Sequence, residues 1–160
     1  MERPTIKLRG HHLLCMLTYI GQGYTQVFSD SFSNKMKGIS EGTTEIEIVY
    51  GAKDDLCQVL QCDPSCPADI ARHCLEGDAA RRDDMALATL SAFLRLPLKS
   101  GYRLRLTPEY VRILRQEFAA GTIRQACAGC EWFDLCTAVA REGYRSVKLF
   151  PPKYPSLTIS

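Results

Sequence analysis

The sequence predicts an α+β fold that is predominantly α: a single small helical domain with a short strand pair and a cysteine-rich loop tied to the C-terminal helices by metal. A chain of 160 residues suits one domain, and its 46% hydrophobic residues can bury a core without outside help. Apolar residues recur at helical spacing along most of the chain. Eight cysteines in a chain of this length indicate either metal ligands or disulfides.

The N-terminal half is expected to hold two helices between two extended segments. Residues 5–8 suit a short strand or an extended lead-in, and apolar residues in 11–20 follow helical spacing. A second helical pattern covers 24–39 and is expected to end near Gly38. Residues 44–50 alternate isoleucine with glutamate, which is typical of a strand with one buried face.

The C-terminal half is expected to hold three helices and one short strand. A threonine followed by proline starts the middle helix, and a glycine is placed to end it. The helices are predicted at residues 80–96, 107–121 and 131–141, and the strand at 104–106. We expect one cysteine-rich metal-binding domain over residues 1–160, with an extended tail from 146 to 160.

The segment between Gly51 and Asp78 differs from the rest. It contains four cysteines, two prolines and two glycines, and its apolar residues show little periodicity. Such a segment buries little apolar surface by itself, so it needs metal ligation or packing against neighbours to be ordered. We interpret it as an irregular cysteine-rich loop.

The charges nearly balance, because 20 basic residues stand against 18 acidic ones and leave a formal charge of +2. This balance predicts neither nucleic acid nor a membrane surface as the main partner. No apolar run approaches the ~20 residues needed to span a bilayer, and no export signal with a cleavage site is recognisable. We therefore expect a cytoplasmic protein, in which cysteines serve as ligands rather than as disulfides.

The most informative motif is Cys127-x-x-Cys130 followed by Cys136. A Cys-x-x-Cys turn points two sulfurs at one ion, and its glycine permits the close backbone approach that such turns use. A third sulfur can return after a short helical turn, while Trp132 and Phe133 shield the site from water. The alternatives are three unrelated buried thiols or a redox dithiol.

The fourth ligand is expected from the cysteine-rich loop, with Cys57 as first choice, Cys74 as second and Cys66 as an outsider. Four thiolates suit either a [4Fe–4S] cluster or a structural zinc site of four cysteines in a binding module, so spacing alone does not choose between them. We favour the cluster, because ligation by sulfur only with aromatic shielding suits iron and inorganic sulfide.

A second cluster of reactive residues lies near the N-terminus, where His11, His12 and Cys15 follow an arginine and a glycine. On a helix, His11 and Cys15 share a face, so a thiol enzyme with Cys15 as nucleophile and His11 as base is a third hypothesis. The simpler interpretation makes Cys15 a core residue and the histidines part of a helix start. Asp54 and Asp55 are interpreted as a cap.

Four motifs together resemble domain-of-unknown-function family 1284, over about residues 5–145: Leu8-Arg-Gly-His-His-Leu-Leu-Cys15, Asp54-Asp-Leu-Cys57, His73-Cys74 and Cys127-x-Gly-Cys-Glu-Trp-x-x-Leu-Cys136. The resemblance implies a small bacterial or archaeal protein proposed to bind iron and sulfur, with no established reaction. It also implies a family pattern of six cysteines: Cys15, Cys57, Cys74, Cys127, Cys130 and Cys136. Our leading hypothesis is thus a [4Fe–4S] protein in electron transfer or redox sensing, which serves an unknown redox partner protein.

Overall fold

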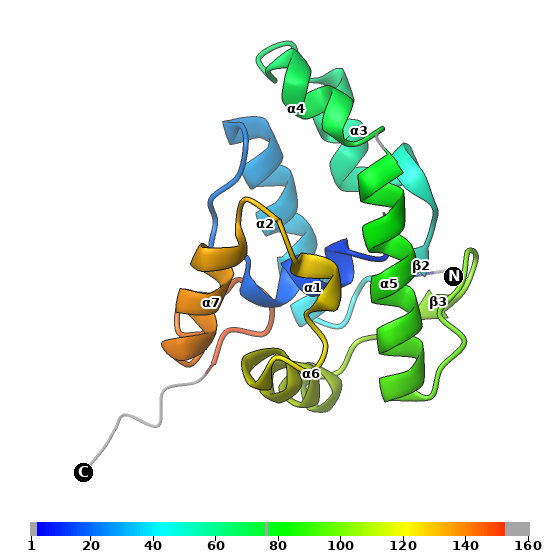
Figure 1. Ribbon diagram of the computed structural model, residues 1–160, viewed down its shortest axis with the longest axis vertical. Coiled ribbons are helices and arrows are strands. Elements are labelled where there is room, and N and C mark those ends of the chain that lie inside the picture. The colour runs from blue at the N-terminus through cyan, green and yellow to red at the C-terminus, as the bar shows by residue number, and fades with distance from the viewer. Residues whose placement is uncertain (1–2, 76, 153–160) are drawn as a thin grey trace.

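The computed structural model describes residues 3–75 and 77–152. Within these ranges the chain forms seven α-helices and a small sheet that lies at one side of the molecule (Figure 1), which confirms the predicted α+β, predominantly α class. The helices are α1 (His12–Thr18), α2 (Gln26–Ser40), α3 (Asp55–Cys62), α4 (Ala68–His73), α5 (Gly77–Leu94), α6 (Pro108–Ala120) and α7 (Phe133–Arg141). Two 3-10 turns, η1 (Gly51–Lys53) and η2 (Gln125–Cys127), precede α3 and α7.

The sheet has three strands instead of the predicted pair: β1 (Thr5–Leu8), β2 (Glu45–Ile48) and β3 (Arg103–Leu104), in the order β1-β2-β3. The first two run parallel, and the third runs antiparallel to β2. Alternate residues of β1 and β2 are buried, as the alternation of isoleucine and glutamate predicted. The sheet fixes the chain at the point where it enters α1.

The prediction of an irregular loop between Gly51 and Asp78 is wrong. Two helices and the start of α5 occupy this segment, and Asp54 caps α3 by accepting hydrogen bonds from the amides of Leu56 and Cys57. Leu56, Cys57 and Leu60 form the buried face of α3. The period is helical once the cysteine counts as an apolar residue, so treating the cysteines only as ligands hid it.

Helix α2, predicted to end near Gly38, ends two residues later at Ser40. A Cβ atom at position 38 would lie 2.6 Å from Thr44 Oγ1, so glycine is needed here for close packing and not for a helix end. Beyond α7, Val147 and Leu149 are buried in the core. Most of the predicted tail, residues 153–160, lies outside the described residues.

Helix α1 is the centre of the fold and contacts α5, α6 and α7 (Figure 1). Its apolar side chains, Leu13, Leu14, Met16 and Leu17, are almost completely buried. Cys15 is only partly buried and lines a cavity, unlike the core residue that we expected. None of the described helices is long and apolar enough to cross a membrane.

Candidate functional site

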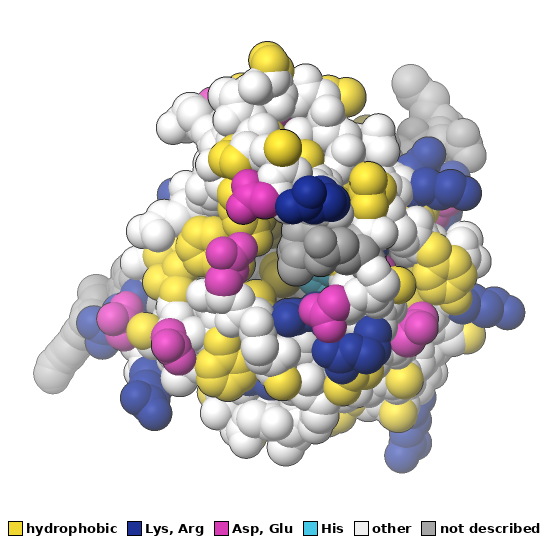
Figure 2. All heavy atoms as spheres, turned by 45° about the horizontal axis from the view of Figure 1, so that its top comes forward, with side chains coloured by type: hydrophobic (Ala, Val, Ile, Leu, Met, Phe, Trp, Pro, Cys, Tyr) yellow, Lys and Arg dark blue, Asp and Glu magenta, His cyan; other side chains and the backbone are white. Residues whose placement is uncertain are grey.

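One cavity of about 400 Å³ collects most of the chain's reactive side chains. Six of the eight cysteines line it, together with both predicted histidines: Cys15, Cys57, Cys74, Cys127, Cys130, Cys136, His11 and His12. In the space-filling view of Figure 2, a histidine is visible at the bottom of a hollow that acidic and basic side chains surround. The cavity is therefore the candidate site, and its cysteines fall into two groups.

The first group, here called the four-cysteine group, consists of Cys15, Cys127, Cys130 and Cys136. The hydroxyl of Thr18, one helical turn after Cys15, donates to Cys136 Sγ at 3.0 Å. Burial raises the pKa of the Cys15 thiol well above its usual value, and the three neighbouring sulfurs raise it further. Helix α1 thus brings a fourth sulfur to the predicted trio.

Hydrogen-bond donors surround the sulfurs of this group. The Trp132 amide donates to Cys130 Sγ at 3.4 Å, and Gly129 has the positive φ of 80° that the predicted turn requires. Arg82 from α5 hydrogen-bonds Cys130, and Arg124 hydrogen-bonds Cys127. These donors and positive charges favour negative charge on the sulfurs.

Aromatic side chains cover the group, and one of them, Tyr24, comes from the segment just before α2. Trp132 is half-buried, and its indole Nε1 donates to Tyr24 Oη at 2.9 Å. Tyr24 in turn donates to Glu131 Oε1 at 2.7 Å. Phe133 is 38% exposed and stacks on the Arg124 guanidinium at 4.2 Å, so it covers the arginine as well as the cavity.

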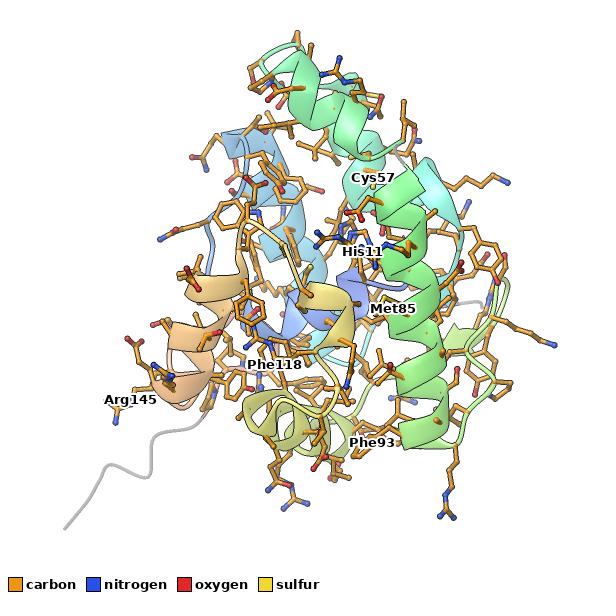
Figure 3. The ribbon with its side chains drawn as sticks, viewed as in Figure 1. His11, Cys57, Met85, Phe93, Phe118 and Arg145 are labelled. Atoms are coloured by element: carbon orange, nitrogen blue, oxygen red, sulfur yellow. The ribbon has the colours of Figure 1, made fainter. Side chains whose placement is uncertain are left out.

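The second group, here called the Cys57–Cys74 pair, lies beneath α3 and α4. The Cys57 thiol hydrogen-bonds the Cys74 sulfur, which raises the pKa of Cys57 and lowers that of Cys74. The buried Arg9 guanidinium donates from Nη1 to Cys57 Sγ at 3.3 Å and to the Cys74 carbonyl at 2.8 Å. Figure 3 shows Cys57 and His11 one above the other on the inner side of α5.

Two buried carboxylates orient the histidines. Asp54 accepts from His12 Nδ1 at 2.7 Å and from three backbone amides, those of Arg9, Leu56 and Cys57. Among the described residues, one set of three ligand atoms lies within 4.8 Å of one another, from His12, Asp54 and Cys57, and it could hold a metal ion. Because Nδ1 of His12 is bound to Asp54, Nε2 is the atom that remains for a ligand or a proton.

Asp83 on α5 accepts hydrogen bonds from three donors in the segment that leads into α1. It accepts from Arg9 Nε at 2.8 Å, from the His11 amide at 3.1 Å and from His11 Nδ1 at 2.6 Å. Burial raises the pKa of Asp83, but the hydrogen bonds from His11 and the charge of Arg9 outweigh it and hold this pKa below its usual range. The Arg9–Asp83 pair therefore links the segment between β1 and α1 to α5.

His11 makes stability depend on pH. Burial and the nearby His12 lower the pKa of His11 from 6.5 to about 4. The charge of Arg9 also lowers this pKa, whereas Asp83 raises it. Between these values the unfolded chain binds a proton that the folded chain does not. The free energy of unfolding is therefore expected to fall by about 3 kcal/mol as the pH falls from 6.5 to 4. Urea denaturation at several pH values measures this change in the free energy of unfolding.

The control for this pH dependence is His11→Gln, which cannot take up the proton. Its stability should change much less over the same interval, whereas an unchanged slope would contradict the assignment. Asp54 and Asp83 have pKa values held below their usual range, so their contributions are lost mainly below pH 4 as the carboxylates become protonated. The two effects thus occupy different pH intervals.

The cavity joins residues that the sequence analysis treated separately. Cys57 and Cys74, predicted as the fourth ligand, lie beside Arg9 and His12, while Cys15 lies beside the trio. Asp83 was not predicted as a site residue, and Arg9 was noted only as the arginine of the N-terminal cluster. The six-cysteine pattern implied by the family resemblance includes both Cys15 and Cys136, and it is the sequence signal that points to this group.

Comparisons with known proteins identify one match. A family model described as "Protein of unknown function (DUF1284)" matches residues 23–136. No curated protein and no solved structure matches the chain. The matched range includes five of the six cavity cysteines, and Cys15 precedes it.

Proposed function

The chain belongs to the DUF1284 family, whose description assigns no chemistry, and we propose that it is an iron–sulfur protein that holds one [4Fe–4S] cluster for electron transfer or redox sensing. The ligands are Cys15, Cys127, Cys130 and Cys136. The observation that carries this proposal is that these four cysteines, from α1, from the turn before α7 and from α7 itself, line the same cavity and influence one another electrostatically.

The spacing of the sulfurs supports a cluster over a single zinc ion. A tetrahedral zinc site with Zn–S bonds of about 2.3 Å holds its sulfurs about 3.8 Å apart. Among the described residues, no three cysteine sulfurs lie within 4.8 Å of one another, since the one set that meets this limit is His12, Asp54 and Cys57. Iron and inorganic sulfide between the thiolates hold four cysteines further apart than one ion does.

The surroundings of the four-cysteine group suit an anionic redox centre. When bound, the cluster would supply reversible one-electron transfer. The chain's own residues hold the thiolates, exclude water with Trp132 and Tyr24, and place two cationic side chains, Arg82 and Arg124, beside the sulfurs. We further propose that the protein works in the cytoplasm, where thiols stay reduced, with a redox protein as partner.

The test is purification under anaerobic conditions, followed by analysis of iron and acid-labile sulfide and by electron paramagnetic resonance after reduction. We expect iron and sulfide in equal amounts, close to one [4Fe–4S] cluster per chain, and a brown protein. Colourless protein with one zinc ion per chain would instead support the alternative of a zinc site with four cysteine ligands. Anaerobic protein that lacks iron, sulfide and zinc would contradict both.

Arg82 offers a separate prediction about the reduction potential. Its positive charge beside Cys130 stabilises the reduced centre, which carries one more negative charge. Arg82→Gln should therefore lower the midpoint potential by some tens of millivolts, where about 60 mV is a tenfold change for one electron. The matched control is Arg81→Gln, because Arg81 also pairs with Asp78 but its side chain is 59% exposed. Equal shifts in both variants would contradict a specific role for Arg82.

A further inference from the structure

Two cavity cysteines remain outside the four-cysteine group and lie close to each other. Cys57 comes from α3 and Cys74 follows α4, and the two helices pack together. One nitrogen of Arg9, Nη1, donates to Cys57 Sγ at 3.3 Å and to the Cys74 carbonyl at 2.8 Å, and both cysteines are free thiols. Two free thiols held beside the same guanidinium need only a limited rearrangement to form a disulfide.

The two thiols differ in access. Cys57 is 2% exposed, whereas Cys74 is partly exposed and directly follows the short helix α4. Thiol–disulfide exchange requires one accessible thiol, which attacks the incoming disulfide. It also requires a second, buried thiol, which then resolves the mixed disulfide. Cys74 suits the first role and Cys57 the second.

The polar neighbours supply what exchange needs from the protein. The Arg9 side chain is 2% exposed and its guanidinium donates to Cys57 Sγ, so it stabilises negative charge on the buried sulfur. His12, oriented by Asp54, has a ring nitrogen within 4.8 Å of the same sulfur and can carry its proton. Arg9 lies just before α1, and His12 is the first residue of this helix.

We propose that Cys57 and Cys74 form a redox-active dithiol that exchanges with a low-molecular-weight disulfide. The Cys74 thiolate attacks one sulfur of the external disulfide, which forms a mixed disulfide and releases one thiolate. The Cys57 thiolate then attacks Cys74, which closes the Cys57–Cys74 disulfide and releases the second thiolate. The two protons of the dithiol pass to the released thiolates, so one disulfide is reduced to two thiols as the other forms.

The same surroundings disfavour a metal ion at this place. Each oxygen of Asp54 already accepts two hydrogen bonds. Oδ1 accepts from the amides of Leu56 and Cys57, and Oδ2 accepts from the Arg9 amide and from His12 Nδ1. The fixed charge of Arg9 also lies 3.3 Å from Cys57 Sγ and repels a cation.

The proposed exchange is independent of the four-cysteine group, since it uses none of the four sulfurs of that group.

The experiment equilibrates the anaerobically purified full chain with mixtures of reduced and oxidised glutathione, alkylates the free thiols and maps the peptides by mass spectrometry. In the unaltered protein we expect Cys57 and Cys74 to lose reactivity together, with a peptide link between them. Cys57→Ser should accumulate a glutathione adduct on Cys74, because no resolving thiol remains. Cys74→Ser should leave Cys57 unmodified.

The matched control is Cys62→Ser, since Cys62 is exposed on the same helix as Cys57 but lies outside the cavity. It should titrate as the unaltered protein does. A link between Cys66 and Cys74, unreactive thiols at every glutathione ratio, or a bound metal ion that protects Cys57 would each overturn the proposal. Iron and sulfide are measured on the same samples, so loss of the cluster is recognised separately from failure of the exchange.

Discussion

Asp83→Asn is expected to lower the free energy of unfolding by about 3–5 kcal/mol, because it leaves the buried Arg9 guanidinium without its counter-charge. The Arg9 side chain is 2% exposed and the Asp83 side chain 3%, so water cannot replace the lost partner. The two histidine donors, the amide and Nδ1 of His11, also lose a charged acceptor. Chemical denaturation under reducing conditions measures the effect.

Asp84→Asn is the matched control, because Asp84 is the next residue of α5 and is exposed. We expect a change within about 0.5 kcal/mol for this variant. A similarly small change for Asp83→Asn would mean that the Cys57 sulfur alone compensates Arg9. Since small proteins are stable by only about 5–15 kcal/mol, the predicted loss is a large part of the total.

Cys15→Ala is expected to abolish cluster binding, so that iron per chain falls at least tenfold relative to the unaltered protein. A four-iron cluster normally needs four protein ligands, and Cys127, Cys130 and Cys136 are the cysteines whose charges raise the pKa of Cys15. Iron and sulfide analysis after anaerobic purification measures the loss, with circular dichroism to check that the chain is folded.

Cys57→Ala is the comparison for Cys15→Ala. This variant should keep its iron, because Cys57 contacts Cys74 and Arg9 and is not placed beside the trio. The opposite result, iron retained without Cys15 and lost without Cys57, would restore the ligand set predicted from the sequence. Loss of iron in both variants would indicate that the two groups act as one centre.

Local signals in the sequence predicted the fold well where each element carries its own cap. The helix from Thr107 to Gly121 is confirmed, since Thr107 Oγ1 accepts from the Tyr110 amide and Gly121 has the positive φ of a helix end. The prediction for the segment between Gly51 and Asp78 was wrong for a different reason, although Asp54 caps α3 there. Its helices are short, and the apolar face of α3 includes a cysteine.

The site was predictable only in part, because its contacts join distant positions. Cys127, Cys130 and Cys136 lie close together in the sequence, so their motif was visible. Cys15 reaches Cys136 only because α1 packs on α7, which no local pattern reveals. Likewise, Arg9 and Asp83 are 74 positions apart, and nothing in either residue's neighbours predicts that both are buried.

Helix α1 and the residues just before it fix the relative positions of the side chains that contact the two cysteine groups. Arg9 and His12 at its start serve the Cys57–Cys74 pair, and Cys15 on its next turn faces the trio. An inserted or deleted residue between His12 and Cys15 would rotate one set of side chains by about 100° relative to the other. Natural selection therefore cannot lengthen this segment without misaligning one centre, and relatives that retain both chemistries should have the same spacing here.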